Sequence, residues 1–282
     1  MDALLQHEPV IRLGFFLGMF AVMAAWELLA PRRVPGVSKA WRWTNNLGIV
    51  FLNTALVRVV FPTTAVALAL SAEANGWGVL NHLALPAWLE IAIAVAVLDM
   101  AIWLQHVMFH AVPALWRLHR VHHADLDYDL TTGARFHPIE ILLSMLIKLA
   151  AILMLGPPAV AVLIFEVVLN ATAMFNHGNV RMPLAFDRLL RLVVVTPDMH
   201  RVHHSIEARE TNSNFGFNLS VWDRLFGTYK AQPDAGHERM TIGIREHRDE
   251  REVDRLPGML ALPFRGAVSD YAINRRSWET KA

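Results

Sequence analysis

Five apolar segments in the first 180 residues approach the length needed to cross the hydrocarbon core of a bilayer as a helix, about 20 residues. They are residues 10–30, 47–70, 84–105, 139–155 and 158–175. Gly156-Pro157-Pro158 separates the last two, which predicts a tight hairpin that returns to the side it came from. Lys148 and Glu166 within this hairpin indicate a partly protein-lined interior. The pattern predicts an all-α fold, a multi-spanning membrane bundle with about 4–5 membrane helices.

The first apolar segment and the loop after it set the expected orientation. Asp2 and Glu8 precede residues 10–30, and Pro31-Arg32-Arg33 follows them in place of a small-residue cleavage site, so a signal peptide fits poorly. We expect a retained membrane helix. The loop PRRVPGVSKAWRW contains basic residues and no acidic one, and the positive-inside rule therefore places it in the cytoplasm.

Two charged residues inside the apolar segments need partners. Arg58, together with Pro62, interrupts residues 47–70, and an arginine at that depth should face the bundle interior or a partner. Asp99 lies two helical turns before His106 on the same face. It could hydrogen-bond a histidine there or pair with Arg58, and the sequence leaves both possibilities open.

Composition supports a membrane protein and limits the chemistry. Hydrophobic residues make up 54% of the chain and the mean hydropathy is +0.33, which is too apolar for an ordinary soluble domain. The formal net charge is +1 and no basic stripe with interleaved aromatic residues is found, so we expect no nucleic-acid partner. Cysteine is absent, which excludes disulfides, thiolate zinc sites and iron–sulfur clusters. Any metal site must use nitrogen and oxygen ligands.

Histidines carry the candidate chemistry, and ten of the fourteen fall between residues 106 and 204. They form three boxes and two single positions: His106-x-x-x-His110, His119-x-x-His122-His123, His200-x-x-His203-His204, and the single His137 and His177. Residues three and four apart share one helix face, so each box presents its imidazoles together. Neutral imidazole is the commonest metal-binding side chain. The eight boxed ligands exceed what one four-coordinate metal needs, and two metals are the simpler interpretation.

A structural interpretation of these histidines is the alternative. A single histidine such as His177 is more often a hydrogen-bonded core residue than a ligand. The repeated boxes differ, because clustered imidazoles without a metal would need many polar partners. Asp125, Asp127 and Asp129 follow the second box, but the glycine and glutamate of a calcium loop are missing, so we expect them to act as counter-charge. Arg120 should lie off the ligand face, in water or against headgroups.

The chain changes character after residue 180. Residues 181–205 include an amphipathic stretch suited to lying on the membrane face, with Thr196 and Pro197 opening the helix of the last box. Residues 212–230 are turn-rich and aromatic, and should brace the site. We predict three parts: N-terminal transmembrane helices (1–94), a cytoplasmic histidine-rich metal domain that includes the membrane hairpin 139–175 (95–230), and a polar cytoplasmic tail with little core (231–282).

The boxes HVMFH, HRVHH and MHRVHH, with RFHPIE and FNHGN between them and NSNFG and WDRLFGTY after them, resemble the fatty acid hydroxylase superfamily. This sterol desaturase-like group consists of integral-membrane, histidine-box di-iron enzymes. The resemblance covers roughly residues 95–230. The family often has arginine directly after its first box histidine, where this chain has Val107, which puts a neighbouring contact in doubt and leaves the metal site intact.

The resemblance implies metal ligands at nine positions: His106, His110, His119, His122, His123, His177, His200, His203 and His204. It implies a ligand or an outer hydrogen-bonding partner at His137. It implies two iron ions, with O2 as co-substrate, and hydroxylation or desaturation of a C–H bond in a lipid such as a fatty acyl chain, sterol, carotenoid or ether lipid. No further catalytic or cofactor-binding residue is predicted, since the histidines act as ligands.

Partners and location complete the prediction. The chain has no flavin, dinucleotide or haem attachment motif, so electrons must come from an external donor, such as a ferredoxin, cytochrome b5 or a reductase. The Ala- and Arg-rich, cysteine-free composition points to a bacterial inner membrane, with the endoplasmic reticulum as the alternative. A histidine-rich metal transporter or metal sensor is the alternative function, although it would place its ligands near the bilayer midplane.

Overall fold

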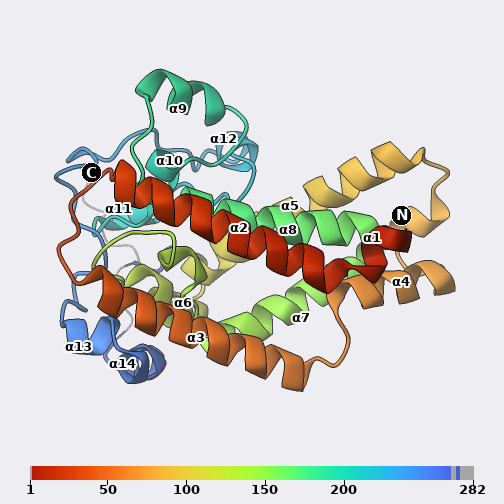
Figure 1. The fold of residues 1–282 in the computed structure, drawn as a ribbon, viewed down its shortest axis with the longest axis horizontal. Coiled ribbons are helices and arrows are strands. Elements are labelled where there is room, and N and C mark those ends of the chain that lie inside the picture. Colours follow the sequence, from red (N-terminus) through yellow and green to blue (C-terminus); the bar gives the residue numbers. More distant parts are fainter. Residues whose placement is uncertain (1, 268–270, 274–282) are drawn as a thin grey trace.

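The computed structural model describes residues 2–267 and 271–273, and helices dominate this part of the chain (Figure 1). The elements in order are α1 (Asp2–Gln6), α2 (Glu8–Leu29), α3 (Lys39–Val60), α4 (Ala65–Asn75), η1 (Val79–His82), α5 (Ala87–Ala111), α6 (Pro113–His123), η2 (Thr132–Ala134), α7 (Pro138–Leu155), α8 (Ala159–Asn176), α9 (Leu184–Leu190), α10 (Pro197–His203), α11 (Ala208–Thr211), α12 (Val221–Leu225), α13 (Glu250–Val253), α14 (Leu256–Ala261) and η3 (Leu262–Phe264). The described residues contain no β-strand, only isolated bridges.

The all-α bundle is confirmed. Among the described residues, five segments are long and apolar enough to cross a membrane: Glu8–Leu29, Lys39–His82, Ala87–Ala111, Pro138–Leu155 and Ala159–Asn176. The long helices α2, α3, α5, α7 and α8 run along the long axis of the molecule in Figure 1. Ala69, Leu98, Ile152 and Phe165 come from four of these segments and pack into one buried apolar cluster.

The predicted hairpin is formed by α7 and α8. Gly156 ends α7 with a φ of 66°, a left-handed conformation that glycine adopts without strain. A Cβ at Gly156 would also overlap the carbonyl oxygen of Trp77, so the loop after α4 closes tightly over this turn. Within the hairpin, Glu166 forms ion pairs with Lys148 and, at 2.8 Å, with Arg12 of α2. The two charges in the hairpin therefore face protein, as the sequence predicted.

The predicted helix over residues 47–70 is wrong in its bounds. Ser38 caps α3, which begins at Lys39 and ends at Val60, and a separate helix α4 begins at Ala65 beyond the Pro62 break. Arg58 therefore lies in the last turn of α3, where its charge complements the helix dipole. Its side chain is exposed, contrary to the expectation that it faces the interior.

Asp99 does neither of the two things that the sequence suggested. Its carboxylate accepts hydrogen bonds from the indole of Trp222, at 2.8 Å, and from the backbone N–H of Leu219, at 3.2 Å. Asp99 thus fastens the segment around α12 to α5, and within the described residues it forms no hydrogen bond with a histidine or with Arg58.

The histidine-bearing helices gather at one end of the long helices. In Figure 1, α6, α10, α13 and α14 lie at this end, together with the loop that joins α2 to α3. An antiparallel bridge between Pro31 and Val180 ties that loop to the segment after α8. The basic loop and the histidine boxes therefore share one side of the bundle.

The expectation that residues 231–282 contribute little core is wrong for the described residues. One buried apolar cluster joins Trp116 and Val121 of α6 to Val253, Met259 and Leu262 of the C-terminal segment. The division of the chain at residues 94 and 230 stays a prediction, but the C-terminal segment is part of the packed fold.

Arg120 was expected in water or at headgroups, and the structure buries it instead. Its side chain is 1% exposed and donates hydrogen bonds to the backbone carbonyls of Leu262, Arg265 and Ala267. These hydrogen bonds from the guanidinium of Arg120 hold residues 262–267 of the C-terminal segment against α6.

Candidate metal centre

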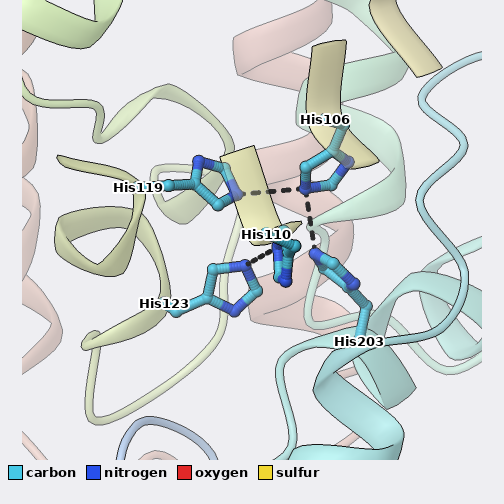
Figure 2. A group of neighbouring side chains, drawn as sticks. All are labelled: His106, His110, His119, His123 and His203. Carbon is cyan, nitrogen blue, oxygen red and sulfur yellow. Dashed lines mark hydrogen bonds between the residues drawn. The ribbon is translucent and has the colours of Figure 1, made fainter. Parts of the chain in front are cut away.

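Nine of the ten predicted histidines come together in two buried groups. The five-histidine cluster contains His106, His110, His119, His123 and His203 (Figure 2), and the four-histidine cluster contains His122, His177, His200 and His204. Within each group, one ligand nitrogen per residue lies within 4.8 Å of the others. All nine side chains are at most 2% exposed.

These side chains come from the ends of two long helices, α5 and α8, and from two shorter helices, α6 and α10. The last turns of α5 carry the first box, and proline at the first position of α6 and of α10 opens the helices of the other two. Thr196 accepts a hydrogen bond from the backbone N–H of Met199 and caps α10. The boxes do not act as units, because the second contributes His122 to one cluster and His119 and His123 to the other.

The ring nitrogens show which atoms could bind a metal. His106 and His203 donate from Nδ1 to the backbone carbonyls of Phe215 (2.8 Å) and Ser213 (2.7 Å). His119 donates from Nδ1 to the carboxylate of Glu140 (2.6 Å). A carbonyl or carboxylate can only accept here, so in each neutral ring the proton sits on Nδ1 and Nε2 keeps its lone pair.

These lone pairs face one another. The Nε2 atom of His106 lies 3.0 Å from Nε2 of both His119 and His203, and dashed lines mark these contacts in Figure 2. Two lone pairs cannot hydrogen-bond, so the arrangement calls for a cation between them. Two ligand nitrogens that each lie about 2.1 Å from a metal are about 3.0 Å apart when the nitrogen–metal–nitrogen angle is about 90°. The residues therefore fit a metal ion.

The four-histidine cluster converges in the same way. Nε2 of His177 lies 3.2 Å from Nε2 of His122, 3.1 Å from that of His200 and 3.2 Å from that of His204. His177 donates from Nδ1 to the carbonyl of Ala173 at 2.8 Å. His177, a single histidine in the sequence, is thus the central member of this cluster.

Burial favours the neutral form of the clustered histidines, which is the form that binds metals. Loss of solvent lowers the pKa of His119 and of His177 to about 3. For His122, His203 and His204 burial again is the largest cause, and neighbouring histidines lower the pKa further. A cluster of neutral imidazoles, each with an unprotonated ring nitrogen, is suited to a metal cation.

His137 is the one predicted site residue that the structure does not bring to either cluster. It caps α7 by accepting at Nδ1 from the backbone N–H of Ile139, and its Nε2 lies 3.3 Å from the carbonyl of Leu260. Glu140, three residues later, contacts the ligand His119, a role that the sequence analysis did not predict although RFHPIE is one of the family segments. A carboxylate behind a ligand histidine holds its tautomer and orientation.

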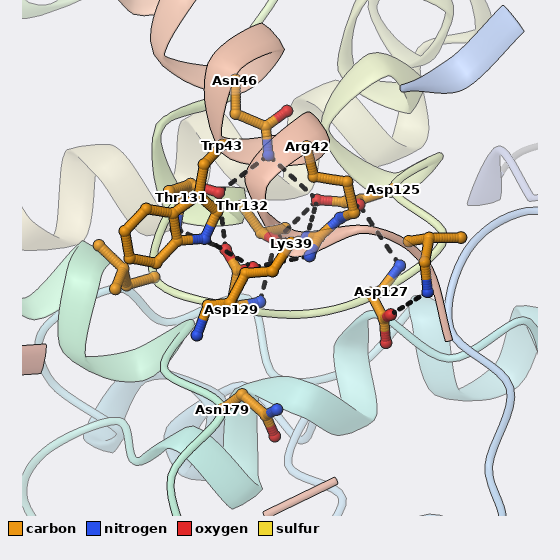
Figure 3. A network of polar contacts seen from close by, with 12 residues as sticks. Lys39, Arg42, Trp43, Asn46, Asp125, Asp127, Asp129, Thr131, Thr132 and Asn179 are labelled. Carbon is orange, nitrogen blue, oxygen red and sulfur yellow. Dashed lines mark hydrogen bonds and ion pairs between the residues drawn. The ribbon is translucent and has the colours of Figure 1, made fainter. Parts of the chain in front are cut away.

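A buried ionic network lies beside the clusters (Figure 3). Arg42 of α3 donates to both carboxylate oxygens of Asp125, each at 2.7 Å, and to Asp129 at 2.6 Å. Arg135 adds an ion pair to Asp125 at 3.3 Å. Burial would raise the pKa of Asp125, but these two guanidinium charges hold it below its ordinary value. Asp125 and Asp129 thus act as counter-charges, as the sequence suggested, and their cationic partners are buried arginines.

The network holds the loop between the second box and α7. Asn46 of α3 donates to Thr131, and Asn53 donates to the carbonyl of Phe136. The ring of Phe136 stacks on His122, with centroids 4.4 Å apart and planes 12° apart. Arg42, Asn46 and Asn53 lie on the buried face of α3, which therefore positions the loop that supports the four-histidine cluster.

Comparison with known proteins identifies this part of the chain. Residues 91–228 match the family model described as fatty acid hydroxylase. All nine residues of the two clusters lie within this range. Nearly half of the chain thus matches the fatty acid hydroxylase family, which confirms the resemblance seen in the boxes.

Several characterised proteins are similar to the chain. The ornithine lipid hydroxylase of Rhizobium tropici is 26% identical over 227 residues, which cover 77% of this chain and 66% of that protein. The alkylglycerol monooxygenase of Homo sapiens is 28% identical over 144 residues, 49% of this chain and 29% of that protein. The cholesterol 25-hydroxylase of Rattus norvegicus is 25% identical over 165 residues, 58% of this chain and 53% of that protein. No solved structure matches the chain significantly.

Proposed function

We propose that this protein is a membrane-bound, O2-dependent lipid hydroxylase with two iron ions in its histidine clusters. The observation that carries the proposal is the pair of buried clusters whose Nε2 atoms converge at 3.0–3.2 Å. Sites of nitrogen ligands without cysteine suit iron. The named relatives, which act on ornithine lipid, alkylglycerol and cholesterol, support a lipid substrate.

The residues of the chain have separate tasks in this proposal. The nine clustered histidines hold the two irons, which when bound supply the activation of O2 for attack on an unactivated C–H bond. Glu140 keeps the proton of His119 on Nδ1 and leaves Nε2 free to bind. Phe215 and Phe217 lie against His106, with ring centroids 5.5 Å and 5.2 Å away, and shield the cluster from water. Hydroxylation is favoured over desaturation because the named relatives are hydroxylases and monooxygenases.

The setting of the reaction follows from the fold. Membrane helices next to the clusters allow an apolar substrate to arrive from the bilayer. Electrons come from an external donor, either a ferredoxin, a cytochrome b5 or a reductase, since the sequence carries no motif for a redox cofactor of its own. The basic loop Arg32–Arg42 lies on the same side of the bundle as the clusters, which supports a cytoplasmic metal centre. The composition of the chain supports a bacterial inner membrane as the location. The metal transporter alternative finds no support, because the clusters sit at one end of the spanning helices.

Elemental analysis and lipid analysis test the proposal together. Protein purified in detergent from iron-supplemented cells should hold about two irons per chain, given two clusters of four or five donors. Cells that express the protein should accumulate a lipid that is heavier by one oxygen, and this product should disappear in a His122→Ala variant. His82→Ala is the matched control, because His82 is exposed and lies in η1 outside both clusters. Iron-loaded protein that yields no oxygenated lipid in any host would contradict the assigned reaction.

A further inference from the structure

Two short helices near the metal centre expose an unusual number of large apolar side chains. Across α9, α12 and the residues that follow each helix, the exposed apolar residues are Leu184, Phe186, Leu189, Leu192, Val193, Val221, Leu225 and Phe226. Several are strongly exposed, with Leu189 at 68% and Leu225 at 66%. We refer to these eight residues as the α9–α12 surface. A contiguous apolar surface of this kind on a folded protein indicates an interaction site.

The two helices form one unit although they are far apart in sequence. Ser220 donates from its backbone N–H to the carbonyl of Val193 at 2.9 Å, and its hydroxyl donates to the carbonyl of Arg191 at 2.7 Å. An antiparallel bridge joins Val194 to Leu219. Figure 1 shows α9 and α12 as neighbours on the same edge of the molecule. Their apolar side chains therefore belong to one surface.

This surface adjoins the membrane-spanning helix α5 within its apolar part. Trp222 donates to Asp99, Trp103 donates to Asp223 at 3.1 Å, and the rings of Trp103 and Phe226 stack with centroids 4.6 Å apart. Trp103 lies eight residues before the end of α5 at Ala111, about 12 Å along the helix axis. The α12 helix therefore sits beside the part of α5 that is expected inside the bilayer.

The chemistry of the surface fits a lipid leaflet. Neither α9 nor α12 is long enough to span a membrane, so apolar exposure on them fits helices that lie in the interface plane. Leu104 of the neighbouring helix α5 is also strongly exposed, at 51%. Arg188 of α9 is exposed, as is Arg181 before this helix, which also forms a 3.8 Å ion pair with Glu238; both charges can meet lipid phosphates.

We propose that the α9–α12 surface is embedded in the bilayer leaflet on the metal side, so that the metal centre is held against the acyl chains. Asp223 of α12 accepts from the backbone N–H groups of Phe215 and Gly216, each at 2.8 Å, and the carbonyl of Phe215 holds His106. One segment, residues 215–226, thus forms the layer between the leaflet and a ligand. Lipid access through this layer rests on the proposed function, whereas the embedding itself does not.

Spin labels measure the embedding without reference to activity. The chain contains no cysteine, so Leu189→Cys and Leu225→Cys each provide a unique site for a nitroxide in the full-length protein in lipid nanodiscs. Both labels should relax faster with dissolved oxygen, which concentrates among acyl chains, than with a water-soluble nickel chelate. Leu104→Cys is the membrane reference and Glu246→Cys, exposed on the C-terminal segment, is the aqueous reference.

Three results are distinguishable. Depth values near that of Leu104→Cys support the embedding, and a diazirine-bearing phosphatidylglycerol should then photolabel peptides containing residues 184–193 and 221–226. Nickel accessibility equal to that of Glu246→Cys would overturn it. Labels shielded from both reagents would also overturn it, because a protein partner would then cover the surface. Any of these results can be obtained whether or not the protein hydroxylates a lipid, so the two proposals fail separately.

Discussion

The two histidine clusters are built from the same residue type but are supported in different ways. In the five-histidine cluster, the Nδ1 atoms of four rings have fixed acceptors: two backbone carbonyls, Glu140 and, at 3.2 Å, Asn212. In the four-histidine cluster, the Nδ1 atoms of His122, His200 and His204 have no hydrogen-bond partner among the described residues. Aromatic rings contact both clusters, but in the four-histidine cluster they are the main support, with Phe136 on His122 and Tyr128 beside His177.

The difference teaches how each cluster is organised for a metal. Hydrogen bonds fix both the orientation and the tautomer of a ring, so the five-histidine cluster is arranged before a metal arrives. Stacking fixes the plane of a ring but leaves its tautomer open. We therefore expect the four-histidine cluster to bind its metal more weakly and to depend on the packing of the loop from Asp125 to Phe136.

Removal of one ligand should have the largest effect. His203→Ala breaks the five-histidine cluster and His200→Ala the four-histidine cluster. Each should lower lipid hydroxylation by more than about 100-fold, because loss of a ligand exceeds the effect of an outer partner. Iron content should fall further in His200→Ala, which leaves three donors, than in His203→Ala, which leaves four. Equal iron loss in both variants, measured by elemental analysis, would argue against the difference between the clusters.

Loss of Arg42 should come next. Arg42→Met leaves the buried carboxylates of Asp125 and Asp129 without their main counter-charge, which typically costs about 3–5 kcal/mol of stability. Thermal unfolding in detergent measures this loss. The four-histidine cluster should lose metal first, because the loop that carries Phe136 is released. Adding Asp125→Asn to Arg42→Met removes one uncompensated charge and should recover part of the stability; no recovery would mean that the charge pairing is not the cause.

The carboxylate behind His119 should have an intermediate effect. Glu140→Ala removes the acceptor that fixes the ring and should weaken metal binding at the five-histidine cluster by about 10–100-fold. Glu140→Gln keeps an acceptor oxygen without the charge and should lose less. Metal titration of the stripped protein separates the two clusters, and an unchanged five-histidine affinity in Glu140→Ala would show that the hydrogen bond is dispensable.

The stacked ring should have the smallest effect. Phe136→Leu retains apolar bulk but removes aromatic stacking on His122, which is worth about 0.5–1.5 kcal/mol. Affinity at the four-histidine cluster should fall by about 2–10-fold, and less at the five-histidine cluster, where Phe136 lies farther from His119, with ring centroids 6.1 Å apart. A Phe136→Tyr variant keeps the stacking and should bind metal as the natural protein does. An equal loss of metal affinity at both clusters in Phe136→Leu, measured by the same titration, would contradict the comparison.

The sequence predicted most of the scaffold because membrane spans and helix-borne ligands are local signals. Residues 10–30 and 139–175 are long apolar runs, and the boxes repeat at helical spacing. How the boxes divide could not be predicted, since His122 and His123 are adjacent in sequence and point to different clusters only through the tertiary arrangement of α6, α8 and α10. The role of Arg42 was hidden for the same reason: its partner Asp125 lies 83 residues away.

The C-terminal segment has a consequence for how the protein is made. Tyr271 stacks on Trp116, with ring centroids 5.8 Å apart. Its backbone carbonyl accepts a hydrogen bond from the side-chain amide of Asn212, whose oxygen in turn accepts a hydrogen bond from Nδ1 of His110. During synthesis all nine clustered histidines have been added by residue 204, but this support does not exist until residue 271 has left the ribosome. The hydrogen-bonded support of the five-histidine cluster is therefore completed only after every spanning helix has been synthesised. A protein truncated before Tyr271 would retain every ligand and still assemble a weakened five-histidine cluster.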